Sequence, residues 1–141
     1  MANCYSEGIK DLINGDIAWD TSSFKVMLVT SSYTFDPDHS HRDEVTNEIT
    51  NTGYTAGGNA LTTVAAAEDA AGNEIECDAT DVTFTSLAAG DQPYAAIIYY
   101  DSGAAATDTL VAYCVLTTPP APDGNNYIVQ WDAEGVFKIT Q

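Results

Sequence analysis

The residues best suited to chemistry gather in one polar stretch of the sequence. Carboxylates and imidazoles alternate there in a pattern that would suit zinc or another transition metal, because alternate residues of an extended loop point to the same side. The residues concerned are Asp36, Asp38, His39, His41 and Asp43. The stretch lacks the glycine and the distal glutamate of a calcium-binding EF-hand loop. Because acidic residues occur throughout the chain, we expect neither a metal site nor a cofactor.

Hydrolytic chemistry would need two carboxylates that converge in a cleft. Asp78 with Asp81 and Asp132 with Glu134 are candidates, but a chain with 21 Asp and Glu residues contains such pairs by chance. The motifs of a nucleophilic serine, a zinc protease or a phosphate-binding loop do not occur. The sequence therefore predicts a protein that is not an enzyme.

Several aromatic residues are candidates for binding. Flat rings stack on sugars while carboxylates hold sugar hydroxyls, although rings at strand ends more often close the ends of a β-sandwich core. The rings considered are those of Trp19, Tyr33, Phe35, Tyr54 and Trp131. Tyr33, Phe35 and Tyr54 lie outside the strong strand patterns. We expect these three to contact another protein, since aromatic residues are enriched at interfaces.

The charge of the chain is strongly one-sided. Four Lys and Arg residues against 21 Asp and Glu give a net charge of −17. Affinity for nucleic acids and anionic membranes comes from cations, so both are excluded as partners. The acidity instead indicates a solvated surface, or adaptation to high ionic strength, where salt screens repulsion between like charges.

Cys4, Cys77 and Cys114 are far apart in the sequence and form no Cys-x-x-Cys pair. In apolar strand contexts such thiols serve as small hydrophobic groups. A Cys77–Cys114 disulfide is the alternative if the two strands are neighbours. The first residues lack the pattern of a signal peptide, and no apolar run reaches membrane-spanning length, so we expect a soluble protein.

The elements that must position these residues are mostly strands. Residues 94–100 are apolar on both faces of a strand, as are 24–30 and 110–116, so these should be central strands covered on both sides. Residues 94–100 are expected to be the partner of 24–30. Residues 6–14 have helical spacing, with Ser6 as the cap and a stop at Asn14-Gly15.

A hairpin is expected from residues 60–67 and 74–79, with Ile75 and Cys77 inward and Glu74, Glu76 and Asp78 outward. Further strands are predicted at 81–87, 127–131 and 135–140. Residues 31–52 form a long polar connection, with one helical turn predicted at 43–47. Connections of this length are often functional.

About eight short strands and one helix within a single domain, residues 1–141, define the predicted fold class. We expect an all-β protein: a two-layer antiparallel sandwich of immunoglobulin-like or jelly-roll style with one short N-terminal helix. A closed barrel is the alternative. The sequence does not give the strand order.

Segments of the first half resemble a family of small structural proteins encoded among the head and tail genes of tailed bacteriophages. They are LINGDIAWDT (12–21), KVML (25–28), SYTFDPD (32–38), DEVTNEI (43–49) and TGYTAGG (52–58). A weaker likeness at 78–84, 97–103, 110–113 and 135–139 extends the resemblance over nearly the whole chain.

The resemblance implies a virion protein without catalytic residues. Its leading form is a capsid decoration or cement protein on the outer head shell, made in the host cytoplasm. The implied partners are the major capsid protein or other virion proteins, and a homo-oligomer is compatible with this role. Many copies arranged by symmetry allow each contact to be modest. A tail, collar or fibre-adaptor component and a glycan-binding module on the virion surface are the alternatives.

Overall fold

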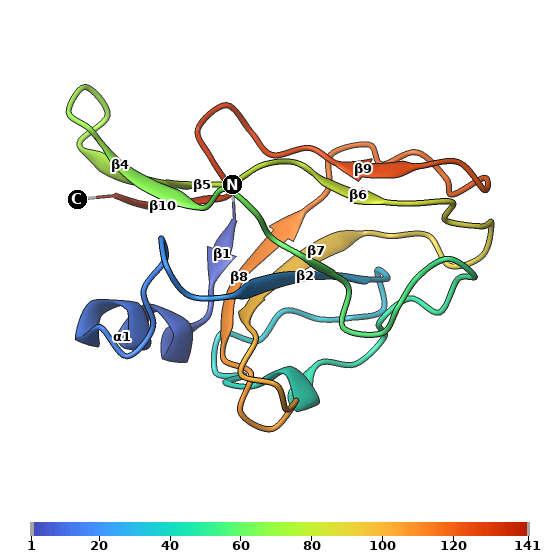
Figure 1. Cartoon of the computed structure of the whole chain (residues 1–141), viewed down its shortest axis with the longest axis horizontal. Coiled ribbons are helices and arrows are strands. Elements are labelled where there is room, and N and C mark those ends of the chain that lie inside the picture. Colours follow the sequence, from blue (N-terminus) through green and yellow to red (C-terminus); the bar gives the residue numbers. More distant parts are fainter. Residues whose placement is uncertain (1, 141) are drawn as a thin grey trace.

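The computed structural model describes residues 2–140, which form antiparallel strands in two layers (Figure 1). The helices are α1 (Ser6–Asn14) and the 3-10 helix η1 (Arg42–Glu44). The strands are β1 (Asn3–Cys4), β2 (Phe24–Val29), β3 (Asn59–Ala60), β4 (Ala65–Asp69), β5 (Glu74–Asp78), β6 (Val82–Phe84), β7 (Ala95–Tyr100), β8 (Leu110–Val115), β9 (Tyr127–Val129) and β10 (Phe137–Thr140). The prediction of an all-β sandwich with one short helix is confirmed. Neither helix is long and apolar enough to cross a membrane.

The first layer is a five-stranded sheet in the order β1-β8-β7-β2-β3. β7 lies at its centre and pairs with β2 from Phe24↔Tyr100 to Val29↔Ala95. The three strands predicted to be central are therefore adjacent, as their apolar residues on both faces require. The predicted pairing of 24–30 with 94–100 is confirmed, and the short strand β1 pairs with β8 on the other side of β7.

The second layer consists of two smaller sheets, in the orders β10-β5-β4 and β6-β9. Both lie on the same side of the five-stranded sheet, above it in Figure 1. The strands of residues 2–140 thus divide into separate sheets and do not form one closed barrel.

The two faces of the central strands are covered by different parts of the chain. Val26 and Ile98 point into the core between the layers, together with Phe84 of β6. Met27 and Ile97 point the other way, into a second cluster covered by the connection that follows β2. The long polar connection therefore acts as a lid on the outer face of the sheet.

Helix α1 packs against β8 with its backbone very close to the strand. A Cβ atom at Gly8 would lie 2.2 Å from the carbonyl oxygen of Leu110, so only glycine fits there. Gly15 ends the helix in the left-handed conformation at φ 80°, as predicted. The predicted cap is wrong by one residue: Tyr5 is the N-cap, and its side chain makes no capping bond.

The hairpin of β4 and β5 forms, but two of its side chains differ from the prediction. Residues 60–67 divide between β3 and β4. Cys77 is buried as expected, whereas Ile75 is 41% exposed and Glu74 only 8% exposed. Glu74 is covered because Lys138 of the neighbouring β10 binds it and Gly72 of the hairpin turn lies close to it. Ile75 is exposed because the small sheet extends past the edge of the core.

All three cysteines are free thiols, so the Cys77–Cys114 disulfide does not form. Burial raises the pKa of Cys77 to about 11 and that of Cys114 to about 12. The reactive thiolate is therefore disfavoured at neutral pH, in keeping with a packing role for these residues.

Candidate functional site

The aromatic residues expected to contact a partner lie mostly inside the molecule. Tyr33 is only 3% exposed, and its hydroxyl is 2.9 Å from the hydroxyl of Tyr5 and 3.1 Å from Nδ1 of His39. Phe35 is partly buried and stacks on Tyr113 at 5.2 Å between ring centroids. In this structure Tyr33 is a core residue, and its ring is not available to a partner.

Tyr54 is also used within the fold. Its ring stacks on Phe84, and its hydroxyl donates to Oε1 of Glu48 at 2.7 Å while accepting from the N–H of Leu28 at 3.0 Å. Burial, followed by the hydrogen bond to the Glu48 carboxylate, raises the pKa of this phenol. Tyr54 therefore fixes the connection to β2.

The rings considered as a sugar-binding platform do not come together. Trp19 is buried, 4.9 Å from Phe137 between ring centroids, and its indole N–H donates to the carbonyl of Ala65. Trp131 is only partly exposed and donates from its indole N–H to the carbonyl of Thr80. Both rings close the core, which is the alternative role considered for strand-end aromatics.

The metal-ligand pattern of residues 36–43 does not form a cluster. Asp36 accepts the N–H of Asp38, and His39 is bound to Tyr33. The backbone of His41 bridges to Thr109. Within residues 2–140, no three groups of this stretch converge closely enough to share an ion.

The carboxylate pairs considered for hydrolysis serve local structure instead. Asp78 accepts the N–H of Ala79, and Asp81 accepts the N–H of Trp131 at 3.0 Å. Asp132 accepts the N–H of Glu134 in the turn before β10. These carboxylates hold turns and strand ends.

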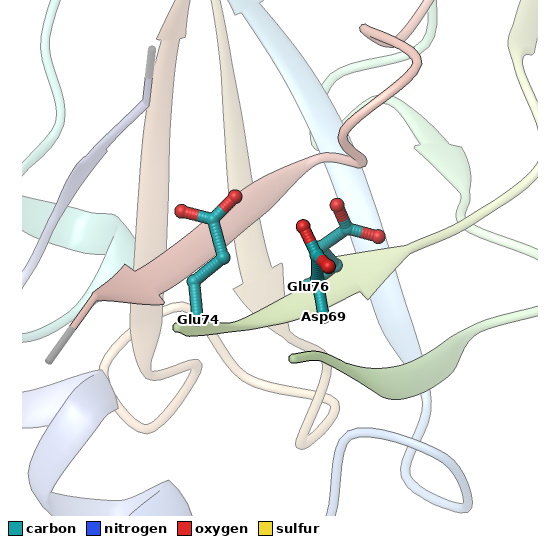
Figure 2. Close-up of side chains that lie close together, drawn as sticks. All are labelled: Asp69, Glu74 and Glu76. Carbon is teal, nitrogen blue, oxygen red and sulfur yellow. The ribbon is translucent and has the colours of Figure 1, made fainter. Parts of the chain in front are cut away.

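Another carboxylate cluster, which the sequence did not reveal, lies on the small sheet. Asp69 of β4 is directly opposite Glu74 of β5, and Glu76 is on the same face two residues along. One oxygen of each lies within 4.8 Å of the others, and Figure 2 shows the three side chains on one side of the sheet. Three convergent carboxylates are ligands of the kind that hard divalent cations prefer.

Lys138 already supplies a positive charge to this cluster. It lies on the adjacent strand opposite Glu76, and its ammonium group donates to Glu74 at 3.0 Å and to Glu134 at 2.6 Å. These hydrogen bonds raise the pKa of Lys138. The cluster is therefore partly neutralised by Lys138, which compensates the charge of the buried Glu74 carboxylate.

The structure contains a groove of about 710 Å³. It lies between the end of β8, β9 and the segment that leads into β10. Val115 and Ile128 are exposed beside it, and Asp132 and Glu134 add carboxylates to its lining. Its lining therefore combines exposed apolar side chains with carboxylates.

Fold and surface together define an acidic, two-layer all-β protein with a groove at one edge of its sheets. Comparison with protein-family models, with curated proteins and with solved structures found no match.

Proposed function

We propose that this chain is a structural component of a tailed-bacteriophage virion, a decoration or cement protein that binds the outer head shell. The proposal begins from the resemblance carried by residues 12–21, 32–38 and 52–58. The fold also supports the proposal. Its aromatic residues and many of its carboxylates stabilise the protein itself, which is compatible with a structural role in which the protein acts by binding neighbouring subunits.

An uncovered apolar pair on the small sheet is the observation that carries the proposal. Ile75 of β5 lies directly opposite Ile139 of β10, and both are exposed. They continue the face on which Cys77 and Phe137 are buried in the core. A capsid subunit that covered this pair would extend the core of the sheet, and apolar contact of this kind is typical at the centre of an interface.

The charge distribution supports the same role. The four Lys and Arg residues all form ion pairs within the chain, through Lys10, Lys25, Arg42 and Lys138. The excess of acid therefore remains on the surface, where it keeps the outward face hydrated. Attachment through one small apolar patch is sufficient where symmetry repeats the contact over a shell.

Copy number in purified particles tests the position of the protein in the virion. Quantitative mass spectrometry against the major capsid protein should give copies on the order of hundreds per particle, as expected for a repeating shell. About a dozen copies or fewer would place the protein on the tail axis and overturn the head-shell assignment.

Particles assembled without the chain should lose integrity at a lower temperature than complete particles. Adding back the purified protein should restore resistance, whereas an Ile75→Ser, Ile139→Ser double variant should not. Ile13→Ser is the matched control, because Ile13 is an exposed isoleucine outside the small sheet. Equal heat resistance with and without the chain would refute the cement role.

A further inference from the structure

The groove beside β9 is bounded by strand edges. Residues 114–118 line one side, from β8 and the loop after it, and 127–132 line the other, from β9 onward. Successive residues of a strand point to opposite faces. A consecutive run lines a groove only where the strand turns its edge toward it. The edge of β9 therefore faces this groove, across from the end of β8 and the loop after it.

Within residues 2–140, β9 is paired on one edge only, with β6. The N–H of Trp131 donates to the side-chain Oδ1 of Asp81 at 3.0 Å. The C=O of Thr83, opposite Ile128, accepts from the side chain of Asn59 in β3. The odd-numbered residues of β9 therefore turn their backbone groups toward β6. Alternate residues of an antiparallel strand use opposite edges. Ile128 and Gln130 therefore direct their N–H and C=O groups toward the groove.

Side chains at this edge add apolar surface and negative charge. Val115 is 46% exposed and Ile128 49% exposed. Asp132 and Glu134 lie at one end, and Lys138, the cation of this lining, is already bound to Glu134 and to the carboxylate cluster. An incoming segment would meet an unpaired backbone edge, an apolar rim and an acidic surround.

We infer that the groove binds an extended, basic segment of another protein, which pairs as an added strand with the free edge of β9. Backbone pairing supplies affinity in this mode of recognition, and alternate side chains supply specificity. Val115 and Ile128 receive the apolar side chains, and lysine or arginine residues of the ligand face the acidic surround. A second copy of this chain is disfavoured because each copy carries −17. The inference goes beyond the proposed virion role and does not depend on it.

Fluorescence anisotropy at low ionic strength with a labelled acetyl-(Lys-Val)4-amide peptide tests the inference. The peptide should bind saturably. A (Glu-Val)4 peptide should bind at least tenfold more weakly, and so should a (Lys-Val)4 peptide methylated at every backbone amide nitrogen, which keeps its charges and side chains but has no backbone N–H. Equal binding of the N-methylated peptide would show that charge and side chains are sufficient for binding and would overturn strand pairing. Equal binding of the acidic peptide would overturn the charge preference.

A variant and a direct measurement locate the binding. Ile128→Pro removes the N–H that faces the groove and leaves the β6 pairing in place; it should weaken binding at least tenfold, whereas Ile75→Ser on the small sheet should not. In the unmodified chain, the amide NMR signals of Ile128 and Gln130 should shift on peptide addition and exchange more slowly with solvent. Saturable binding that leaves both amides unchanged would refute the site even if Ile128→Pro did not fold.

Discussion

Arg42 and Asp108 join two parts of the chain that are 66 residues apart, with Nε of Arg42 donating to Oδ2 of Asp108 at 2.7 Å. Asp108 is fully buried and also accepts the N–H and O–H of Ser102. The Arg42 guanidinium lies over the ring of Tyr99 at 5.2 Å. This ion pair fastens the long connection to the outer face of the central sheet.

Replacing Arg42 with alanine should destabilise the protein by about 3 kcal/mol, because it leaves a buried carboxylate without its counter-ion. Urea unfolding followed by circular dichroism measures the effect. Lys25→Ala is the matched control: its partner Asp101 and the lysine are both partly exposed, so it should cost less than about 1 kcal/mol. Equal losses of unfolding free energy in the two variants would show that the buried Arg42–Asp108 pair stabilises the protein no more than an exposed ion pair does.

The contribution of Asp108 should depend on pH in the acid range. Burial alone would raise the pKa of Asp108, but hydrogen bonds from Arg42 and Ser102 outweigh burial and hold the pKa below its usual value. A lowered folded-state pKa stabilises the protein above the unfolded pKa, about 4, and this contribution is lost as pH falls toward the folded value. The difference in melting temperature between the unmodified chain and Asp108→Asn should therefore narrow below about pH 4. A constant difference would contradict this assignment.

The central strands were predictable because their pattern is local. Residues 94–100 are apolar on both faces of a strand. A segment this short can bury both faces only as a central strand that is covered on both sides. The lid over the outer face was not predictable, because Arg42 and Asp108 find each other only after the sheet has formed. Tyr33 and Tyr54 stand among polar neighbours in the sequence, which indicates exposure, although tertiary packing buries or partly buries them.

The carboxylate cluster depends on a register that the sequence leaves open. Glu74 and Glu76 share a face by alternation alone, but Asp69 joins them only because the turn between β4 and β5 sets it opposite Glu74. A register shift of one residue would point Asp69 to the other face. The alternation of Glu74 and Glu76 was visible in the sequence. The position of Asp69 opposite Glu74 could not be predicted, because the sequence did not show the length of the turn.

Gly8→Ala should destabilise the protein although alanine favours helices. Alanine is better than glycine by about 1 kcal/mol in a helix interior, but the added Cβ would clash with the backbone of Leu110. Overpacking costs about 1–3 kcal/mol, and this clash is with backbone atoms, so a net loss of up to about 2 kcal/mol is expected in urea unfolding after the helix preference of alanine is subtracted. Asn14→Ala, on the exposed last turn, is the control and should be nearly neutral. A stabilised Gly8→Ala variant would show that α1 is not held against β8.

Lys138→Met should lower the melting temperature at neutral pH because it removes the cation from the group formed by Glu74, Asp69 and Glu76. Without Lys138 the three carboxylates repel one another and the buried Glu74 carboxylate has no counter-ion. Adding Glu74→Gln to the Lys138→Met variant should therefore restore part of the melting temperature. Lys10→Met is the matched control: Lys10 pairs with Glu7 and Asp11 on exposed helix surface, where ion pairs contribute little. Differential scanning calorimetry of the variants measures these effects. If Lys138→Met and Lys10→Met melted alike, or if Glu74→Gln gave no rescue, Lys138 would not be the counter-ion of the cluster.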